Sequence, residues 1–338
     1  MNNIGCNTKE RNLGIDLLKA WMAFEVVLCH YGHGSGEFVF RCFFSYFRSM
    51  AVPVFMILSF YLSAHFLLSK EWKFDKLTKR LKRIYLPLVA WALIYWVVYN
   101  GIAFWGHVNG LHLSLKDLLW QAVIGHCYNT AMWFNAVLAL LTVFLYVICK
   151  RWPKYSTAIV LIVSLFSVFL SYSGLNNVFM SLRSELNFPL GRIAEMIPFA
   201  GFGLLLYKSK EDKKYLHLIV FVVLVFVIKE FCGVIYKGEV FSYHYNGMKL
   251  FLCAILLVSL FVYMPLQKSP ACLKKTLAFL SRYSMGVYCI HMLVGTVIGF
   301  LNVDTDPLYY SLLIYFVSLM LCCLISKVPY KLFNDIVA

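Results

Sequence analysis

RNLGIDLLKAWMAFEVVLCHY, residues 11–31, is the stretch that decides how this chain folds. It is long and apolar enough to cross a bilayer as a helix of about 20 residues. Yet it contains Lys19 and His30, and ionisable groups inside a membrane are costly unless they have partners and a function. Because a helix turns every ~3.6 residues, their spacing places these two side chains within about 20° of one face and roughly 16 Å apart along the axis.

Two carboxylates accompany them. Asp16 lies one turn before Lys19 on the same face, where we expect it to neutralise the ammonium. Glu25 points to a different side of the helix. A purely structural interpretation stays open at this point, with Lys19 paired to Asp16 and His30 an interfacial residue near the end of the span.

The composition indicates a polytopic membrane protein. Of the 338 residues, 61% are hydrophobic and 14% charged, against ~45–50% and ~25% in soluble domains. The 11 cysteines are scattered and form no CxxC pair, so we expect buried thiols and no metal site. Although the net charge is +15, the basic residues follow a membrane pattern, and we expect no nucleic-acid partner.

Hydropathy predicts an all-α membrane domain of ten spans that occupies residues 1–338. The spans are helical because an open sheet cannot satisfy its backbone in lipid. One of them contains Arg192, Glu195 and Pro198 and is the least regular. The predicted spans are about 13–31, 49–68, 84–106, 131–149, 156–174, 190–207, 215–235, 248–266, 283–301 and 308–326.

The lysines and arginines predict the orientation. With these spans, 22 of the 31 basic residues fall on the side that holds both termini, and six fall on the opposite side. Positively charged loops stay in the cytoplasm, so both termini are expected there. His30 then lies near the outer end of the first helix. In the outer loop, residues 114–125 (SLKDLLWQAVIG) predict a short amphipathic helix.

Residues 70–83 form the strongest basic cluster, and it includes Lys79, Arg80 and Arg83. Basic positions recur every three or four residues among apolar ones, which predicts an interfacial helix that runs into the third span. Attraction to anionic headgroups explains such a cluster. A site for a phosphate-bearing cytoplasmic ligand explains it as well, since the arginine fork matches phosphate oxygens. Both interpretations stay open.

Several segments together resemble the membrane acyltransferase 3 family. Lys19 precedes His30 by the interval of its first-helix signature, and VPVFMILSFYLS at 52–63 resembles its second-helix motif. KRLKRIYLP at 79–87 is similar to the basic entry of its third helix. The pair Trp133-Phe134 resembles its Trp-Phe element, and SRYSMGVYCIH at 281–291 its late Ser-x-Gly-x-Tyr-x-x-His element. The resemblance runs in order over almost the whole chain.

Three positions depart from the family pattern. Phe60 follows Ser59 where the family usually has glycine, and Met292 follows the late histidine where a proline is common. Lys19 replaces the commoner arginine, which keeps the charge and loses bidentate geometry. We expect differences in packing from these changes, not lost chemistry.

The resemblance implies transfer of an acyl group, typically acetyl, from cytoplasmic acyl-CoA to a hydroxyl of a surface glycan or lipid-linked sugar. It also implies a bacterial cytoplasmic membrane and a reaction that depends on His30. A sugar hydroxyl is a poor nucleophile, so a histidine general base, kept neutral by burial in the bundle, suits the chemistry. Glu25 or Glu195 would stabilise the imidazolium. We expect Lys79, Arg80 and Arg83 to bind the phosphates of CoA, and Lys19 to guide its pantetheine arm.

The remaining candidates have supporting roles. Buried histidines such as His291 are usually structural, but its match to the late family element makes it, with Tyr288, a support for the site. Arg192 and Glu195 are one turn apart and predict an ion pair, and Trp133 begins a helix where aromatic belts are ordinary. Asp16 and Ser59 complete the residues that we expect near the substrates.

Two other functions fit some of the same features. Intramembrane charges also mark the substrate pathways of transporters, although the internal repeats and broken helices of many transporters are not apparent here. A non-catalytic relative that serves as a membrane partner is the other alternative, and Phe60 is the residue that favours it.

Overall fold

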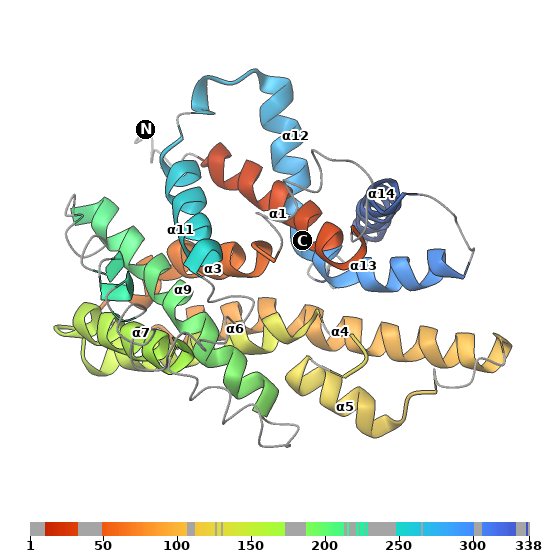
Figure 1. Ribbon diagram of the computed structural model, residues 1–338, viewed down its shortest axis with the longest axis horizontal. Coiled ribbons are helices and arrows are strands. Elements are labelled where there is room, and N and C mark those ends of the chain that lie inside the picture. The colour runs from red at the N-terminus through yellow and green to blue at the C-terminus, as the bar shows by residue number, and fades with distance from the viewer. Residues whose placement is uncertain are drawn as a thin grey trace, which may run out of the picture.

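In the residues that it describes, the computed structural model contains helices and connecting turns and no strand. The described residues are 11–32, 49–106, 112–125, 127–129, 131–172, 187–212, 215, 221–222, 224–226, 228, 248–264, 266–300, 306–328 and 336. The helices, shown in Figure 1, are α1 (Leu13–Tyr31), α3 (Ala51–Leu67), α4 (Phe74–Gly106), α5 (Leu115–Ile124), α6 (Trp133–Arg151), α7 (Ser156–Tyr172), α9 (Asn187–Asp212), α11 (Met248–Tyr263), the 3-10 turn η1 (Leu266–Lys268), α12 (Ala271–Arg282), α13 (Ser284–Gly299) and α14 (Pro307–Ser326).

Every predicted span except 215–235, most of which lies outside the described residues, falls on one of these helices. By length and composition, α4, α6 and α14 are able to cross a membrane. The pair α12 and α13, bent by 56° where they meet, makes a fourth span if it is counted as one. Helices α3, α7 and α11 are apolar but shorter. The sequence did not predict α12, because its lysines make it too polar to be a span.

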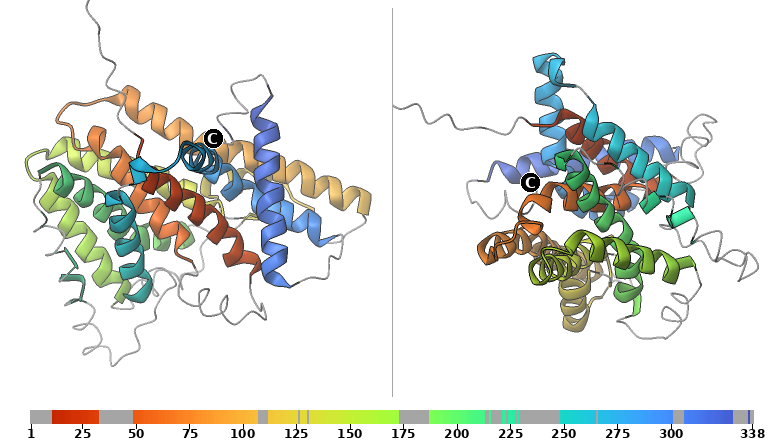
Figure 2. Two further views of the ribbon diagram at one scale, coloured as in Figure 1. Left: turned by 90° about the horizontal axis from the view of Figure 1, so that it is seen from above. Right: turned by 90° about the vertical axis from the view of Figure 1, so that its left-hand side faces the viewer.

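Helix α1 lies in the middle of the bundle, with α3 and α11 on one side and α13 and α14 on the other (Figures 1 and 2). Asn12 starts it: the side-chain oxygen accepts from the amide of Ile15, and the side-chain nitrogen donates to the carbonyl of Val262 at 2.9 Å. A Cβ on Gly14 would lie 2.0 Å from the carbonyl oxygen of Phe261. The absence of a side chain there lets α1 and α11 approach closely.

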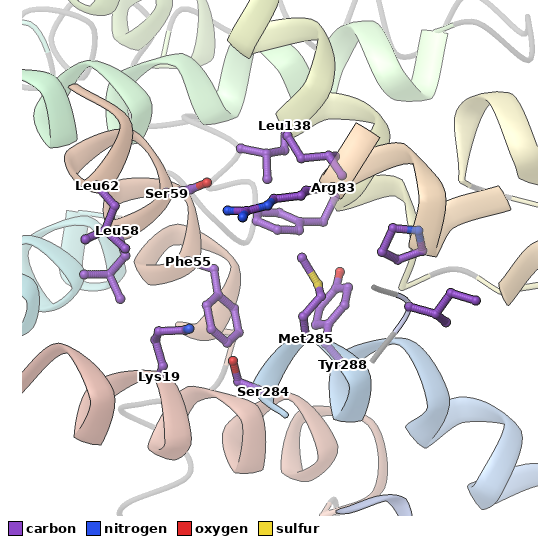
Figure 3. Close-up of a pocket in the computed structure, with 14 residues that line it drawn as sticks. Lys19, Phe55, Leu58, Ser59, Leu62, Arg83, Leu138, Ser284, Met285 and Tyr288 are labelled. Carbon is purple, nitrogen blue, oxygen red and sulfur yellow. The ribbon is translucent and has the colours of Figure 1, made fainter. Parts of the chain in front are cut away.

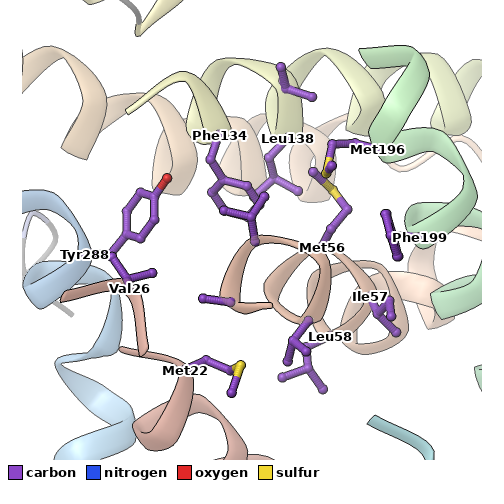
Figure 4. Packing of buried hydrophobic residues seen from close by; sticks show 14 of the residues in the cluster. Met22, Val26, Met56, Ile57, Leu58, Phe134, Leu138, Met196, Phe199 and Tyr288 are labelled. Carbon is purple, nitrogen blue, oxygen red and sulfur yellow. The ribbon is translucent and has the colours of Figure 1, made fainter. Parts of the chain in front are cut away.

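The core between α1, α3, α6 and α9 consists of apolar and aromatic side chains. Met22 and Met56 pack with Phe134 and Phe199 in this region (Figure 4), and all four are buried. On the outside, large apolar residues stay exposed in helical ridges. Val89, Leu93 and Val97 on α4 are an example, and exposed residues of α14 such as Phe316 and Met320 are another. An apolar exterior of this extent is typical of a surface that contacts lipid.

Two local predictions from the sequence are confirmed. The basic segment and the third span form one helix, α4, which begins at Phe74 and passes through Pro87. Residues 115–124 form α5, which starts with a capping box: Ser114 accepts from the amide of Asp117 and donates to its carboxylate. These bonds from Ser114 hold the pKa of Asp117 below its usual value.

Candidate active site

A cavity of about 470 Å³ opens between α1, α3, α4, α6 and α13. Lys19, Ser59, Arg83, Ser284 and Tyr288 supply its polar groups, and apolar side chains complete the lining (Figure 3). We call it the basic cavity. It brings together residues that are up to 317 positions apart in the chain, from Lys19 to Ile336, so only the packing of the helices creates it.

Lys19 reaches the basic cavity from α1. Its ammonium points toward the cavity beside Phe55 (Figure 3), and within the described part of the chain it forms no hydrogen bond and no ion pair. The expected interaction with Asp16 is present only as an attraction between the two charges, without an ion pair in direct contact. The Asp16 carboxylate instead binds the guanidinium of Arg11 and accepts from the Ser281 hydroxyl at 2.7 Å. Lys19 is therefore a half-buried cation that faces an empty space large enough for a ligand.

Arg80 and Arg83, one turn apart on α4, have different surroundings. The Arg80 guanidinium donates to the Ser59 hydroxyl at 3.0 Å and to Thr142 at 3.3 Å, and it also contacts Ser63. Among the described residues no carboxylate pairs with it. Arg83 is exposed, and its guanidinium extends into the cavity toward Ser59 (Figure 3). Arg80 thus joins α3, α4 and α6, whereas Arg83 is accessible to a ligand.

Phe60 and Lys79 complete this region. Phe60, where the family pattern has glycine, is fully buried, and the guanidinium of Arg80 lies 5.6 Å from the centre of its ring. The larger residue therefore stabilises the arginine by a cation–π contact. Lys79 is exposed and does not line the basic cavity.

A second, smaller cavity of about 80 Å³ contains His30. Glu25, Cys29, Trp133 and Tyr288 also line it, and we call it the histidine cavity. His30 lies at its rim and is exposed, so the expected burial of this side chain is wrong. His30 belongs to the last turn of α1, which ends at Tyr31.

Glu25 caps the start of α3. Its two carboxylate oxygens accept from the amides of Met50, at 3.3 Å, and Ala51, at 3.0 Å. A carboxylate at a helix N-terminus satisfies amides that have no partner inside the helix and interacts favourably with the helix dipole. Glu25 therefore fixes α3 against α1, next to His30.

His291 faces His30 from α13, with 5.2 Å between the ring centres. Its Nδ1 lies 2.8 Å from the carbonyl oxygen of Tyr288 and 3.2 Å from that of Val287. Carbonyl oxygens only accept hydrogen bonds, so Nδ1 carries the hydrogen and Nε2 is a bare acceptor. Nε2 is buried and has no hydrogen-bond partner among the described residues. The two histidines, 261 positions apart, therefore form a pair in which one ring is fixed and the other is open to solvent.

A protein-family model described as an acyltransferase domain matches residues 12–327. The chain belongs to the acyltransferase 3 family. No curated protein and no solved structure shows significant similarity to it. The match includes every residue of both cavities except Ile336. Membership of this family, together with the apolar helices, supports a membrane-bound acyltransferase.

The predicted ion pair on α9 is confirmed, but it does not line either cavity. Arg192 donates to Glu195 at 2.6 Å, and Glu195 is fully buried. The Arg192 guanidinium lies 5.3 Å from the centre of the Trp133 ring, and Trp133 lines the histidine cavity. The ion pair therefore supports the wall of the histidine cavity through the contact of Arg192 with Trp133.

Sequence reasoning missed Tyr95, which is fully buried on α4. Its hydroxyl donates to the carbonyl of Cys289 at 2.9 Å and accepts from the amide of Leu293 at 2.8 Å. These two groups pair with each other in a regular helix, and His291 lies midway between them. Nothing in the sequence around Tyr95 distinguishes it from its neighbours Trp96 and Tyr99.

Proposed function

We propose that the protein is an O-acyltransferase of the bacterial cytoplasmic membrane. It takes an acyl group, acetyl by preference, from cytoplasmic acyl-CoA and transfers it to a hydroxyl of a surface glycan or lipid-linked sugar. The observation that carries the proposal is the basic cavity, in which Lys19 and Arg83 face open space and which meets the histidine cavity at Tyr288. In the topology predicted from the sequence, with ten spans and both termini in the cytoplasm, the basic cavity lies on the cytoplasmic side.

The donor fits the basic cavity by charge and by shape. Coenzyme A carries phosphates at one end, for which the exposed fork of Arg83 is suited. Its pantetheine arm is uncharged and narrow. Lys19 lies deeper, on α1, where its ammonium is able to bind a carbonyl oxygen of the arm. Arg80 holds Ser59 and the walls of the cavity in place and does not need to touch the donor.

The acceptor fits the histidine cavity. Because His30 is exposed, a bulky glycan is able to present a hydroxyl to it without entering the bundle. His30 removes the proton from that hydroxyl, and the oxygen attacks the thioester carbon. The carbon–oxygen bond forms, the carbon–sulfur bond breaks, and the proton passes from His30 to the departing thiolate, which leaves as CoA.

His291 positions the base in this scheme. In this scheme one nitrogen of His30 donates a hydrogen bond to the bare Nε2 when the substrates are bound, a bond that the structure itself does not contain, and the other nitrogen of His30 is then turned toward the acceptor. Such an orienting partner fixes the tautomer of a catalytic histidine, as carboxylates do elsewhere. His30 is the proposed catalytic residue, and His291 is a positioning residue.

The test is acyl transfer by the purified protein. With isotope-labelled acetyl-CoA and a glycolipid extract, we expect CoA release and labelled acceptor with the wild type and neither with His30→Ala. His65→Ala is the matched control, because His65 is an exposed histidine on α3 that lines neither cavity. Unchanged transfer by His30→Ala would remove His30 from the mechanism. Movement of an intact solute across proteoliposomes, without CoA release, would favour a transporter instead.

A further inference from the structure

Three aromatic rings from three helices meet beside the basic cavity. Phe55 on α3, Phe134 on α6 and Tyr288 on α13 are mutual neighbours. The distances between ring centres are 6.4 Å for Phe55 and Phe134, 6.3 Å for Phe55 and Tyr288, and 5.7 Å for Phe134 and Tyr288. The rings are tilted or edge-on to one another, which is the favoured packing of aromatic pairs. We call these three residues the aromatic collar.

The aromatic collar lies at the boundary between the two cavities. All three residues line the basic cavity, and Tyr288 also lines the histidine cavity. Figure 3 shows Phe55 and Tyr288 pointing into the basic cavity from different helices. An acyl group that is bound through its CoA in the basic cavity therefore lies against these rings, and Tyr288 stands between it and the histidine cavity.

Two members of the collar are fixed and one has more freedom. Phe134 and Tyr288 are buried, and the Tyr288 hydroxyl donates to the carbonyl of Ala131 just before α6 begins. Phe55 is only half-buried. The gap that the collar leaves is consequently set by rigid rings on two sides and by one less constrained ring on the third.

We propose that the aromatic collar selects the acyl group by size. It admits a short acyl chain such as acetyl to His30 and excludes a long one such as octanoyl. The inference rests on the proposed acyl transfer and adds to it the residues that decide the donor. The physical reason is that displacing a ring in close-packed surroundings costs free energy. Each extra methylene of the acyl chain must displace the rings further, so the cost rises with chain length.

The first test compares the kcat/KM for acetyl-CoA and octanoyl-CoA in the purified protein. Phe55→Leu and Phe134→Leu shorten a collar residue while keeping it apolar. We expect each to raise the octanoyl-to-acetyl ratio by about 10-fold or more, in line with the discrimination that hydrophobic pockets achieve. Phe251→Leu is the control: Phe251 is equally buried but packs with Phe199 and Phe221, away from both cavities. A loss of folding lowers both rates together and leaves the ratio unchanged.

The second test does not need turnover. Cys29 lines the histidine cavity. A maleimide is added to inside-out vesicles, and mass spectrometry measures how fast it modifies Cys29. This rate reports how readily the reagent passes from the side of the basic cavity to the histidine cavity. We expect Phe55→Leu and Phe134→Leu to accelerate this modification, and Phe251→Leu to leave it unchanged. If both readouts stay at the wild-type level in the collar variants, the size filter is wrong while acyl transfer stands. If the modification accelerates but no acyl-CoA is used, the collar limits passage between the cavities, but the proposed reaction fails and selection of an acyl group fails with it.

Discussion

Tyr95→Phe is the substitution whose effect follows most directly from the structure. It removes a fully buried hydroxyl that bonds to both the Cys289 carbonyl and the Leu293 amide on α13. A hydrogen bond of this kind contributes about 0.5–1.5 kcal/mol, so the two together are worth roughly 1–3 kcal/mol. We expect the free energy of unfolding to fall by up to this amount, because Phe fills the same space but makes neither bond, and any bond that α13 then closes between the two groups recovers part of the loss.

The same substitution should also lower acyl transfer. Without the hydroxyl, α13 is able to close its own bond between Cys289 and Leu293, and the backbone at His291 shifts. A backbone shift next to the proposed base His30 lowers kcat more than it changes KM for acyl-CoA, because the proposed site for acyl-CoA is the basic cavity. Such a split between the two constants separates positioning from a general loss of folded protein.

Tyr99→Phe is the matched control for Tyr95→Phe. It lies one turn further along α4, and among the described residues its hydroxyl bonds to the Thr296 side chain alone, at 3.1 Å. The assay is thermal or denaturant unfolding in detergent, followed by transfer kinetics on the same preparations. If Tyr95→Phe matches Tyr99→Phe in both stability and kcat, then the hydroxyl does not hold α13. A double-mutant cycle with His291→Ala should show strong non-additivity in kcat, since one residue acts through the other.

Three further predictions concern α3, its contact with α9 and the donor site. Lys150→Met should lower the free energy of unfolding by about 2 kcal/mol, because the buried ammonium binds carbonyls at the C-terminus of α3, among them that of Phe66 at 2.8 Å. Thermal unfolding measures this change, and an unchanged unfolding temperature would contradict the role of Lys150. Gly203→Ala should destabilise the protein, since a Cβ would lie 2.3 Å from the carbonyl oxygen of Ile57, whereas Gly101→Ala, with nothing within 4 Å, should not; equal unfolding temperatures would refute this. Arg83→Met should raise KM for acetyl-CoA by roughly 10-fold with little change in kcat, and Lys82→Met should leave both constants unchanged; a similar KM in the two variants would remove Arg83 from donor binding.

The sequence predicted the features that depend on neighbours along the chain. Apolar runs located the helices, and the spacing of Ser114 and Asp117 is the pattern of a capping box, which the structure contains. The interval between Arg192 and Glu195 predicted their ion pair correctly. Each of these interactions is local, so the periodicity of the helix is sufficient to predict it.

Contacts between distant segments were not predictable in the same way. Lys19 and Asp16 are one turn apart, yet Asp16 binds the guanidinium of Arg11 and also accepts a hydrogen bond from Ser281, a contact that depends on how α12 packs against α1. The approach of His291 to His30 depends on how α13 crosses α1. Periodicity does not determine such crossings.

The exposure of His30 shows a limit of the same kind. Hydropathy places the residue inside an apolar run, and an apolar run alone does not reveal how many helices surround each end of it. The exposed position suits a large acceptor better than the buried one that we expected. Phe60, interpreted from the sequence only as a lost glycine, is a stabilising neighbour of Arg80.

Mass spectrometry of surface glycans tests the central claim most directly. Cells that lack the gene are compared with cells that express the wild type or His30→Ala at equal membrane levels. We predict a mass increment of one acyl group on a glycan with the wild type, and loss of that increment with His30→Ala as well as without the gene. Glycans that are identical in all three strains, or an increment that persists with His30→Ala, would contradict the account.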